Sequence, residues 1–517
     1  MPDIHLITPP SSAKAIEAAL SQNPHLTSLP LPRADILAPQ NLTQTSGTAE
    51  ILREPEVQAA VTGDFIVLPC DLVCELAGES LLEAWMIQQA GLGGVAASTL
   101  DYLGPTMGVG GEKGGRRGGL GVWFQTDDKY HSKDEETDFI ITTALTNPLV
   151  PPPEGSLRSS ISNLAYSTPK DTLKDITDEK KVFPIRHSLL RKHGRIRMLT
   201  KHRDAHIYLF PYWVLDMVKE NEVMTSVSED VVGWWAKAGW QDRLGDKLGL
   251  REILSNNDIK HTETGSHHSD SIEEDMDIGS MSATQTSTFT SSTLTSYTSP
   301  LASRISTPKV GSTELPPKTP LTIPPMLAYI QPDDPKKPLI RRVDDASLLL
   351  TISLHLATLP SSSDTSSDVL LSPLSHAFKI ADPSLIAPRT TITASNTLLD
   401  ANVTVEEKCV IKECCIGSNC TIKSGARLTR CVLMDGVTVG ERVQLTGCVL
   451  GRRCVVGKEA NLKDCEVQGG FGVEEGVEGK GEKFMVFEGL EDVGGDGEDE
   501  EGMGLEEEGE DEEMESS

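Results

Sequence analysis

A 17-residue repeat of aliphatic residues is the strongest hydrophobic pattern in the chain and runs from Val403 to Val467. Aliphatic residues recur there at intervals of six, five and six positions, and two residues before each one stands a small or medium apolar residue. Side chains two apart in a strand share a face, so each coil should have three short strands with two inward-facing residues apiece. The repeat therefore predicts a triangular parallel β-helix of about four coils, stacked about 4.8 Å apart. The aliphatic positions are Val405, Ile411, Ile416, Ile422, Leu428, Leu433, Val439, Leu445, Leu450, Val456, Leu462 and Val467.

Seven of the ten cysteines fall on inward-facing positions of this repeat. We expect them to be core residues, because a column of cysteines along the coil axis cannot converge tetrahedrally on one zinc ion. Glycines that follow the aliphatic positions are expected at tight corners that need a residue without a Cβ. The cysteines are Cys409, Cys414, Cys420, Cys431, Cys448, Cys454 and Cys465, and the glycines are Gly417, Gly440, Gly451 and Gly457.

One outward-facing column of the same repeat is apolar. It contains Cys415, Val432 and Val449, with Met434 beside them. Apolar residues stacked on an outer face predict a docking surface for another domain or subunit. The alternative is a set of scattered apolar surface residues, which soluble proteins commonly have.

The N-terminal half alternates strand-like and helix-like segments. Residues 3–8 (DIHLIT) have the pattern of a strand, residues 14–23 (KAIEAALSQN) have helical spacing, and residues 64–73 (DFIVLPCDLV) form an apolar run. This alternation predicts an α/β domain with a largely parallel sheet. Ligands of such sheets bind at the carboxyl ends of strands, where Asp71 is expected and where an acidic residue commonly holds a divalent cation against phosphates.

Two further features of this half have more than one interpretation. A cationic cluster in residues 186–197 is compatible with phosphate or RNA binding, but a solvated face or pairing with an acidic partner is favoured by the overall charge. A glycine-rich stretch at residues 108–121 lacks the Gly-Lys-Ser/Thr ending of a phosphate-binding loop, so we predict a flexible insertion. The cluster consists of Arg186, His187, Arg191, Lys192, Arg195 and Arg197.

Composition sets the predicted domain boundaries. Residues 1–254 form the α/β domain, a Ser/Thr/Pro-rich insertion at 255–325 is expected to be disordered, and 326–360 supply a closing strand and helix, with Asp344 near the start of that helix. The coils occupy 384–470, and an acidic tail at 488–517 is also expected to be disordered. The formal net charge is −30. A basic footprint for DNA, a membrane-length apolar run and a secretory signal are not recognisable, which predicts a cytosolic protein.

The order of the two predicted domains resembles a known superfamily. A nucleotidyltransferase-like domain followed by hexapeptide-type coils is similar to the sugar-1-phosphate nucleotidyltransferases, such as GDP-mannose pyrophosphorylases. The segments GTAEILREPEVQ, DFIVLPCDLVCEL, residues 183–216 and the coil segment 414–451 resemble more closely the family of gamma subunits of eukaryotic translation initiation factor 2B. The resemblance implies a Rossmann-like α/β domain followed by a left-handed β-helix.

Residues of the family's nucleotide cleft match only in part. The resemblance implies that Gly47 and Thr48 belong to a base-contacting turn and that Asp71 corresponds to the metal-binding Asp. Where the enzymes have Asn-Ala-Gly-Ile-Tyr at the sugar site, this chain has Asp204 and, in place of the glycine, His206. The glycine-rich loop that holds the triphosphate in the family should precede residue 3. That unit also supplies a central strand, so we expect a true start about fifty residues upstream.

The function implied by the resemblance is that of a structural and regulatory gamma subunit that is not itself an enzyme. Its partners would be the homologous epsilon catalytic subunit, the other subunits of the complex, and the GTPase initiation factor that delivers initiator tRNA. No metal, cofactor, DNA or membrane is expected. The alternative is a sugar-1-phosphate nucleotidyltransferase. A hexapeptide acyltransferase is disfavoured because such enzymes use a His base at the coils, and no His follows His376.

Overall fold

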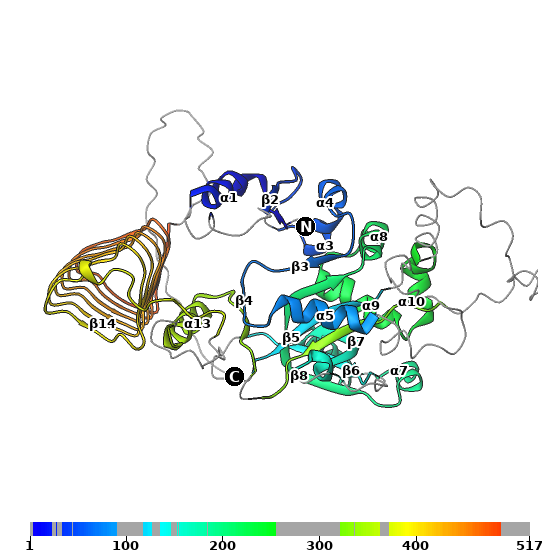
Figure 1. The fold of residues 1–517 in the computed structure, drawn as a ribbon. Helices are drawn as coiled ribbons and strands as arrows, with labels where there is room; N and C mark the ends of the chain where they lie inside the picture. Colours follow the sequence, from blue (N-terminus) through cyan, green and yellow to red (C-terminus); the bar gives the residue numbers. More distant parts are fainter. Residues whose placement is uncertain are drawn as a thin grey trace, which may run out of the picture. The chain divides into compact units, whose positions relative to one another are not determined.

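The computed structural model describes residues 4–22, 27, 34–43, 45–89, 117–126, 135–145, 152, 155–183, 185–254, 321–334, 337–361 and 372–486. The chain forms two compact units, Met1–Leu349 with Ser372–Leu374, and Leu350–Leu371 with Ser375–Ser517 (Figure 1). The first unit is an α/β domain and the second contains a parallel β-helix, so the predicted fold class is confirmed. Residues 255–320 of the predicted insertion and the predicted acidic tail lie outside the described residues.

A six-stranded sheet forms the centre of the first unit. Its order is β3-β8-β5-β9-β7-β6. The long strand β8 pairs antiparallel with β3, β5 and β6, whereas β5 and β9 pair in parallel. The expectation of a largely parallel sheet was therefore wrong, because one 14-residue strand returns alongside three others. The strands are β3 (Phe65–Val67), β5 (Gly119–Gln125), β6 (Asp138–Thr143), β7 (Ile161–Pro169), β8 (Arg197–Phe210) and β9 (Met326–Ile330).

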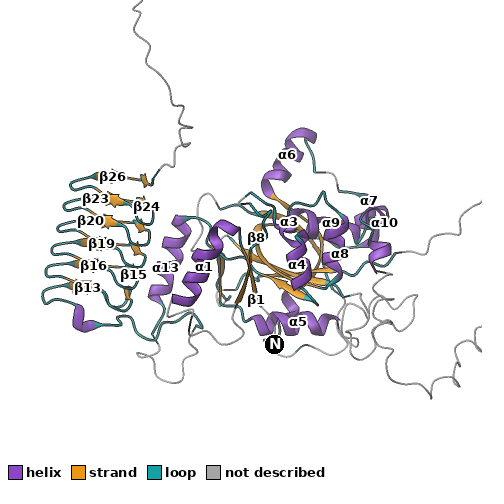
Figure 2. Ribbon diagram, turned by 90° about the horizontal axis from the view of Figure 1, so that it is seen from above, coloured by secondary structure: helices purple, strands orange, loops and turns teal. Residues whose placement is uncertain are grey.

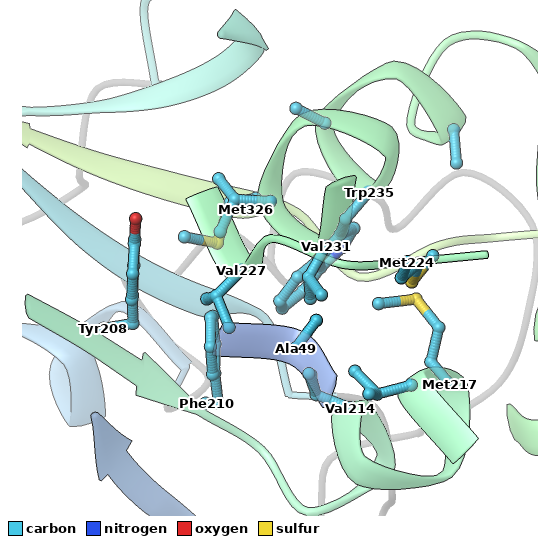
Figure 3. Packing of buried hydrophobic residues seen from close by; sticks show 14 of the residues in the cluster. Ala49, Tyr208, Phe210, Val214, Met217, Met224, Val227, Val231, Trp235 and Met326 are labelled. Atoms are coloured by element: carbon cyan, nitrogen blue, oxygen red, sulfur yellow. The ribbon is translucent and has the colours of Figure 1, made fainter. Parts of the chain in front are cut away.

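Helices cover both faces of this sheet because side chains along β8 alternate between two apolar clusters. Tyr208 and Phe210 point into the larger cluster, where Ala49, Val227 and Trp235 meet them (Figure 3). Leu209 points to the other face and packs with residues of helix α5. Figure 2 shows α5 on one side of the strands and α3, α8 and α9 on the other. The helices are α3 (Thr48–Arg53), α4 (Pro55–Ala60), α5 (Gly78–Gln89), α6 (Lys170–Lys180), α7 (His187–Lys192), α8 (Trp213–Glu220), the π-helical turn η4 (Val227–Val232), α9 (Gly233–Ala238) and α10 (Asp242–Lys247), with a 3-10 turn η3 (Leu157–Ser160).

Two smaller strand pairs complete the first unit. β1 (Ile4–Ile7) and β2 (Ala34–Leu37) pair in parallel and flank α1 (Pro10–Gln22), which confirms the predicted strand and helix at this end. The apolar run at 64–73 is divided between β3 and β4 (Leu72–Cys74), with Asp71 in the turn between them. β4 pairs antiparallel with β10 (Ile340–Arg342).

Two expectations about insertions need correction. The end of the glycine-rich stretch is no insertion, because residues 119–121 begin the fully buried strand β5; residues 108–116 lie outside the described part. A Cβ on Gly119 would lie 2.7 Å from the Trp235 ring, so glycine lets the indole pack on the central strand. Some of the last five residues of the predicted insertion also contact the core. Leu321 and Ile323 pack against it, and the Trp235 indole donates a hydrogen bond of 2.7 Å to the Pro324 carbonyl.

The predicted closing elements fall in different units. The strand is confirmed as β9, a member of the central sheet, and the helix is confirmed as α13 (Ala346–Thr358). From Leu350 onward α13 belongs to the second unit. Asp345 caps this helix by accepting a 2.6 Å hydrogen bond from the Leu348 amide, while Asp344 forms an ion pair with Arg203.

The β-helix has about six turns, more than the four predicted, and ends at Phe484 rather than at residue 470. Successive coils pair in parallel with a shift of 17 residues, as in Cys415↔Val432 and Val432↔Val449.

The strands of the β-helix form three parallel sheets. A 3-10 turn η5 (Pro383–Leu385) precedes the first coil strand. One sheet contains β11 (Thr391–Ile392), β14 (Val410–Lys412), β17 (Arg427–Thr429), β20 (Gln444–Thr446), β23 (Asn461–Lys463) and β26 (Glu478–Lys480). The second contains β12 (Leu398–Leu399), β15 (Cys415–Ile416), β18 (Val432–Leu433), β21 (Val449–Leu450), β24 (Glu466–Val467) and β27 (Lys483–Phe484). The third contains β13 (Thr404–Val405), β16 (Thr421–Ile422), β19 (Thr438–Val439), β22 (Val455–Val456) and β25 (Gly472–Val473).

The interior of the coils is as predicted. The aliphatic positions and the seven inward-facing cysteines are all buried in one apolar cluster. Hydrogen bonding with the stacked thiol of Cys414, together with burial, raises the pKa of Cys431 to about 12. Such thiols carry no thiolate at neutral pH and act as small apolar side chains.

The corners are formed differently from the prediction. Residues with positive φ mark the corners at intervals of six, five and six, and most of them are not glycine. Gly440 and Gly451 are not among them. They face the next coil instead: a Cβ on Gly451 would lie 2.4 Å from the Gly469 amide nitrogen. Coil stacking, and not corner geometry, therefore requires glycine at these positions. The corner residues from the second coil onward are Asn402, Lys408, Glu413, Asn419, Gly425, Arg430, Gly436, Arg442, Gly447, Arg453, Glu459, Asp464, Gly470, Gly476 and Gly481.

Among the described residues, no helix is both long and apolar enough to cross a membrane.

Substituting Leu445 with Asp should lower the free energy of unfolding of the β-helix by on the order of 3 to 5 kcal/mol, because it buries an unpaired charge. Leu445 is 1% exposed, whereas its neighbour Gln444 is exposed, so Gln444→Asp is the matched control. Seven of the ten cysteines lie in the coil core, so thiol labelling in a urea titration reports on this domain. Equal labelling midpoints for the two variants would contradict the register.

Candidate nucleotide-binding cleft

The turn that contains Gly47 and Thr48 is packed against another segment of its own chain. Gly47 precedes α3, and its amide donates a 3.0 Å hydrogen bond to the Glu50 carboxylate. The Thr48 hydroxyl accepts a 2.9 Å hydrogen bond from the Val227 amide, and the Ala49 amide donates one of 2.9 Å to the Thr225 carbonyl. A Cβ on Gly47 would lie 2.2 Å from that carbonyl oxygen. Glycine is therefore needed here for packing within the domain.

Asp71 is paired with an arginine. The Arg342 guanidinium donates from Nη2 to Asp71 Oδ2 at 2.9 Å and from Nε to the same oxygen at 3.1 Å. The backbone holds the pair in place, because the Val343 amide donates to the Asp71 carbonyl at 2.8 Å. Both side chains are more than four-fifths buried, with exposures of 17% and 18%. The carboxylate thus has a fixed cationic partner within the chain.

Arg342 also contacts His206, which joins two of the predicted site residues. Its Nη1 lies 3.3 Å from His206 Nε2. Burial is the main cause that lowers the pKa of His206, and the nearby Arg342 charge adds to it. A neutral imidazole can accept a hydrogen bond at Nε2, which fits a guanidinium donor at that position.

His206 has a backbone conformation that is unusual for a residue with a side chain. His206 has φ of 52°, in the left-handed region that glycine favours. It lies in a bulge of β8, where residues 205–207 stand opposite the single residue Val122 of β5. β8 keeps this conformation although the residue at this position, His206, has a side chain. The imidazole consequently projects toward Arg342 and Asp71.

Both carboxylate oxygens of Asp204 accept hydrogen bonds from within the domain, and the residue is 3% exposed. Its Oδ1 accepts from the His206 amide at 2.8 Å. Its Oδ2 accepts from the Tyr208 hydroxyl and from the Ser228 hydroxyl, the latter at 2.9 Å. A carboxylate with three such donors ties the bulge of β8 to the π-helical turn η4.

A second carboxylate lies directly behind Asp204. Asp138 Oδ2 accepts a 2.6 Å hydrogen bond from the Asp204 amide. Burial, and then the negative charge of Asp204, raise the pKa of Asp138 to about 7. Arg203, next along β8, pairs with Asp344 at 2.5 Å. Arg203 and Asp204, neighbours on β8, are thus held by different partners, an ion pair for the first and hydrogen bonds for the second.

The structure joins most of the predicted cleft residues through residues that the sequence did not indicate. Asp71 and His206 meet at Arg342, and the segment 225–228 links Thr48 to Asp204 through Val227 and Ser228. Arg342 is separated from Asp71 by 271 positions, so no local pattern could have connected them. Among the described residues, no group of three or more His, Cys, Asp or Glu side chains is placed to hold a metal ion.

The apolar column of the coils is largely covered. Val432 and Val449 are only 7% and 8% exposed although they point outward, and Met434 is partly buried. The Cys415 thiol donates a 3.2 Å hydrogen bond to the Ser353 carbonyl of α13, which Figure 2 shows beside this sheet. Burial raises the pKa of Cys415 to about 11. The chain's own helix thus contacts this column, which leaves less apolar surface for another subunit than the sequence predicts.

Comparisons with known proteins find similarity over part of the chain. A family model described as the GMPPB C-terminal domain matches residues 382–477. Translation initiation factor eIF2B subunit gamma from Schizosaccharomyces pombe is 32% identical over 93 residues. The predicted resemblance is confirmed. That alignment covers 18% of this chain and 20% of the relative, so the chain spans about a fifth of the curated protein that it matches.

A solved structure is similar in part. It is a mutant of perosamine N-acetyltransferase from Caulobacter crescentus in complex with CoA and GDP-perosamine. The sequence identity is 20%, with coverage of 20% of this chain and 53% of the other, and a TM-score of 0.16. So low a score says nothing about function.

Substituting Gly47 with Ala should lower the free energy of unfolding of the α/β domain by about 1 to 3 kcal/mol, since the new methyl group overlaps a backbone carbonyl. All six tryptophans lie in this unit, so tryptophan fluorescence in urea measures its unfolding. Gly63→Ala is the control, because a Cβ there meets no atom within 4 Å. A Gly47 variant as stable as the control would contradict the packing argument.

The raised pKa of Asp138 predicts a pH dependence of stability. Because its folded-state pKa of about 7 lies above the unfolded value of about 4, the folded state binds the proton more tightly. This contribution is fully present below about pH 4 and is lost as pH rises through about 7. Asp138→Asn should therefore flatten the decline in stability between about pH 4 and 7, measured by tryptophan fluorescence. The exposed helix residue Asp178, changed to Asn, should leave the decline unaltered; equal slopes for both variants would exclude Asp138 as its source.

Proposed function

We propose that this chain is a non-catalytic, structural and regulatory subunit of translation initiation factor 2B that supports GDP–GTP exchange on the GTPase initiation factor. Its partners would be the epsilon catalytic subunit and the other subunits of that complex, in the cytosol. The similarity of part of the chain to an eIF2B gamma subunit supports this proposal.

The pairing of Asp71 with Arg342 is the main support for the proposal that this chain is not itself a catalyst. In the related enzymes the corresponding Asp is implied to bind the metal that neutralises phosphate charge. Here a buried guanidinium holds both oxygens within hydrogen-bonding distance, at 2.9 to 3.3 Å. Displacing it would leave a buried, unpaired arginine, which is strongly unfavourable. The carboxylate is therefore committed to a structural ion pair.

Two further features favour the same conclusion. The His206 imidazole projects beside Asp71, at the position that a glycine keeps open for a sugar in the family that this chain resembles. Asp204 accepts hydrogen bonds from one amide and two hydroxyls, so it has little capacity left for a ligand. The cleft then acts as a packed element of a scaffold. Exchange would follow from the assembly stabilising the nucleotide-free GTPase.

The alternative is a sugar-1-phosphate nucleotidyltransferase, which keeps Gly47 and Asp71 in corresponding positions. One experiment separates the two. The full-length tagged chain is recovered from its native cytosol, its partners are identified by mass spectrometry, and the eluate is tested for GDP release and for turnover of mannose 1-phosphate with GTP. We expect a stoichiometric catalytic partner and GDP release. Sugar-nucleotide synthesis by the isolated chain, or full-rate GDP release by it alone, would overturn the proposal.

The coil surface around Met434 provides a matched variant for the same experiment. If the remaining exposed part of the Cys415, Val432, Met434 and Val449 column contacts a subunit, Met434→Glu should reduce partner recovery by about tenfold, as expected for a charge placed in an apolar interface. Val455 is 50% exposed on another outward column, so Val455→Glu is the control. Equal recovery with both variants would remove this surface from the proposal.

A further inference from the structure

A cavity of about 520 Å³ opens at the edge of the central sheet of the first unit where β8 begins. It is formed where β6 ends and where β7 and β8 begin, together with the 3-10 turn η3. Its volume lies within the range that small-molecule sites occupy, about 300 to 1,000 Å³. Arg197 at its wall is seven residues along β8 from Asp204, which corresponds to about 23 Å in an extended strand. The cavity is therefore separate from the nucleotide cleft.

The polar lining of this cavity is entirely cationic or neutral. Three arginines and three hydroxyl residues contribute to it, and none of the described residues that line it is acidic. These six residues are Arg158, Arg195, Arg197, Thr142, Ser159 and Ser162. The net charge of the whole chain is −30, so a cavity lined by three arginines and by no acidic described residue differs from the average composition of the chain. Guanidinium groups bind phosphate oxygens in a bidentate manner, and hydroxyls add neutral donors.

Strand pairing holds part of this lining in place. Arg197 pairs with Thr142 across β8 and β6, so their side chains share a face of the sheet. Arg158 belongs to η3, which leads directly into β7. Burial lowers the pKa of Arg158, although an arginine remains charged at neutral pH. Arg195 lies in the loop that leads into β8, two residues before Arg197, so the lining joins the start of β8 to the turn η3.

The remaining wall is apolar, with Ala144, Leu145, Pro152, Ile161 and Ile196. A hollow lined by both cationic and apolar residues fits a phosphate group attached to a small organic body. A bare anion would leave the apolar wall unused, and an extended RNA backbone prefers an open groove with stacking side chains. We propose that this cavity, here called the arginine pocket, binds a small phosphate monoester, such as a sugar phosphate or a nucleoside monophosphate.

Binding by the full chain tests the proposal, with glucose 6-phosphate and GMP as probes and glucose, guanosine and a short single-stranded RNA as comparators. Isothermal titration calorimetry should detect at least one of the two phosphorylated probes and neither of the unphosphorylated ones. Affinity should fall as salt concentration rises, since the contact is ionic. Failure of both phosphate monoesters to bind, or binding of the RNA alone, would overturn the proposal.

Matched variants locate the site. Arg195→Ala with Arg197→Ala should weaken binding by about tenfold or more, because hydrogen bonds between charged groups are lost. Arg186→Ala with Arg191→Ala removes the same charge from residues outside the pocket lining and should change affinity by less than about twofold. Circular dichroism confirms that each variant is folded. An equal loss of affinity in both double variants would show that the arginine pocket is not the site. A loss of affinity in an Asp71→Asn variant alone would place the ligand in the nucleotide cleft instead.

This inference does not depend on the proposed function. The arginine pocket would bind its ligand whether or not the chain joins an exchange complex, and the partner-recovery experiment does not measure small-molecule binding. Each proposal can therefore be contradicted by its own experiment without affecting the other.

Discussion

The buried carboxylate of Asp204 holds together the part of the α/β domain in which a nucleotide cleft was expected. It accepts hydrogen bonds from the His206 amide, the Tyr208 hydroxyl and the Ser228 hydroxyl, and its own amide is held by Asp138. These bonds stabilise a bulge in β8 that places His206 at φ of 52°. A non-glycine residue in that region costs roughly 1 kcal/mol or more, and the carboxylate network offsets this strain. The bulge then directs the imidazole to Arg342, so His206 joins the ion pair at Asp71.

The β-helix depends on a different constraint, the close stacking of identical coils. Every coil repeats the backbone of the one before it, so any side chain that points at the next coil must be absent or small. Gly440 and Gly451 satisfy this condition against Gly457 and Gly469. Corners are less demanding, because Asn, Lys, Arg, Glu and Asp residues there adopt positive φ. The interior is filled by aliphatic residues and thiols whose burial stabilises each coil on its neighbours.

Prediction from sequence was most successful where the determining contacts repeat along the chain. The core cysteines, the register of the coils and helix α1 were all predicted correctly, because each follows from periodicity within a few turns. The number of coils was underestimated: beyond Val467 the aliphatic pattern weakens into glycine, yet Glu466 and Val467 still pair with Lys483 and Phe484. Similarly, β5 was missed because its first residues, Gly119 to Gly121, continue a glycine-rich stretch. Its strand character comes from pairing with β8 and β9 on both sides.

The sequence by itself determined the two kinds of fold, the inward and outward faces of the coils and the residue types at the expected cleft. Local periodicity and residue chemistry suffice for these. Only the tertiary structure decided how the cleft residues are used, because Arg342 reaches Asp71 across 271 positions and Ser228 reaches Asp204 from another element. It also gathered Arg158, Arg195 and Arg197 around one hollow. Such groupings depend on which strand ends the folded sheet brings together, and that information is not contained in any single stretch of sequence.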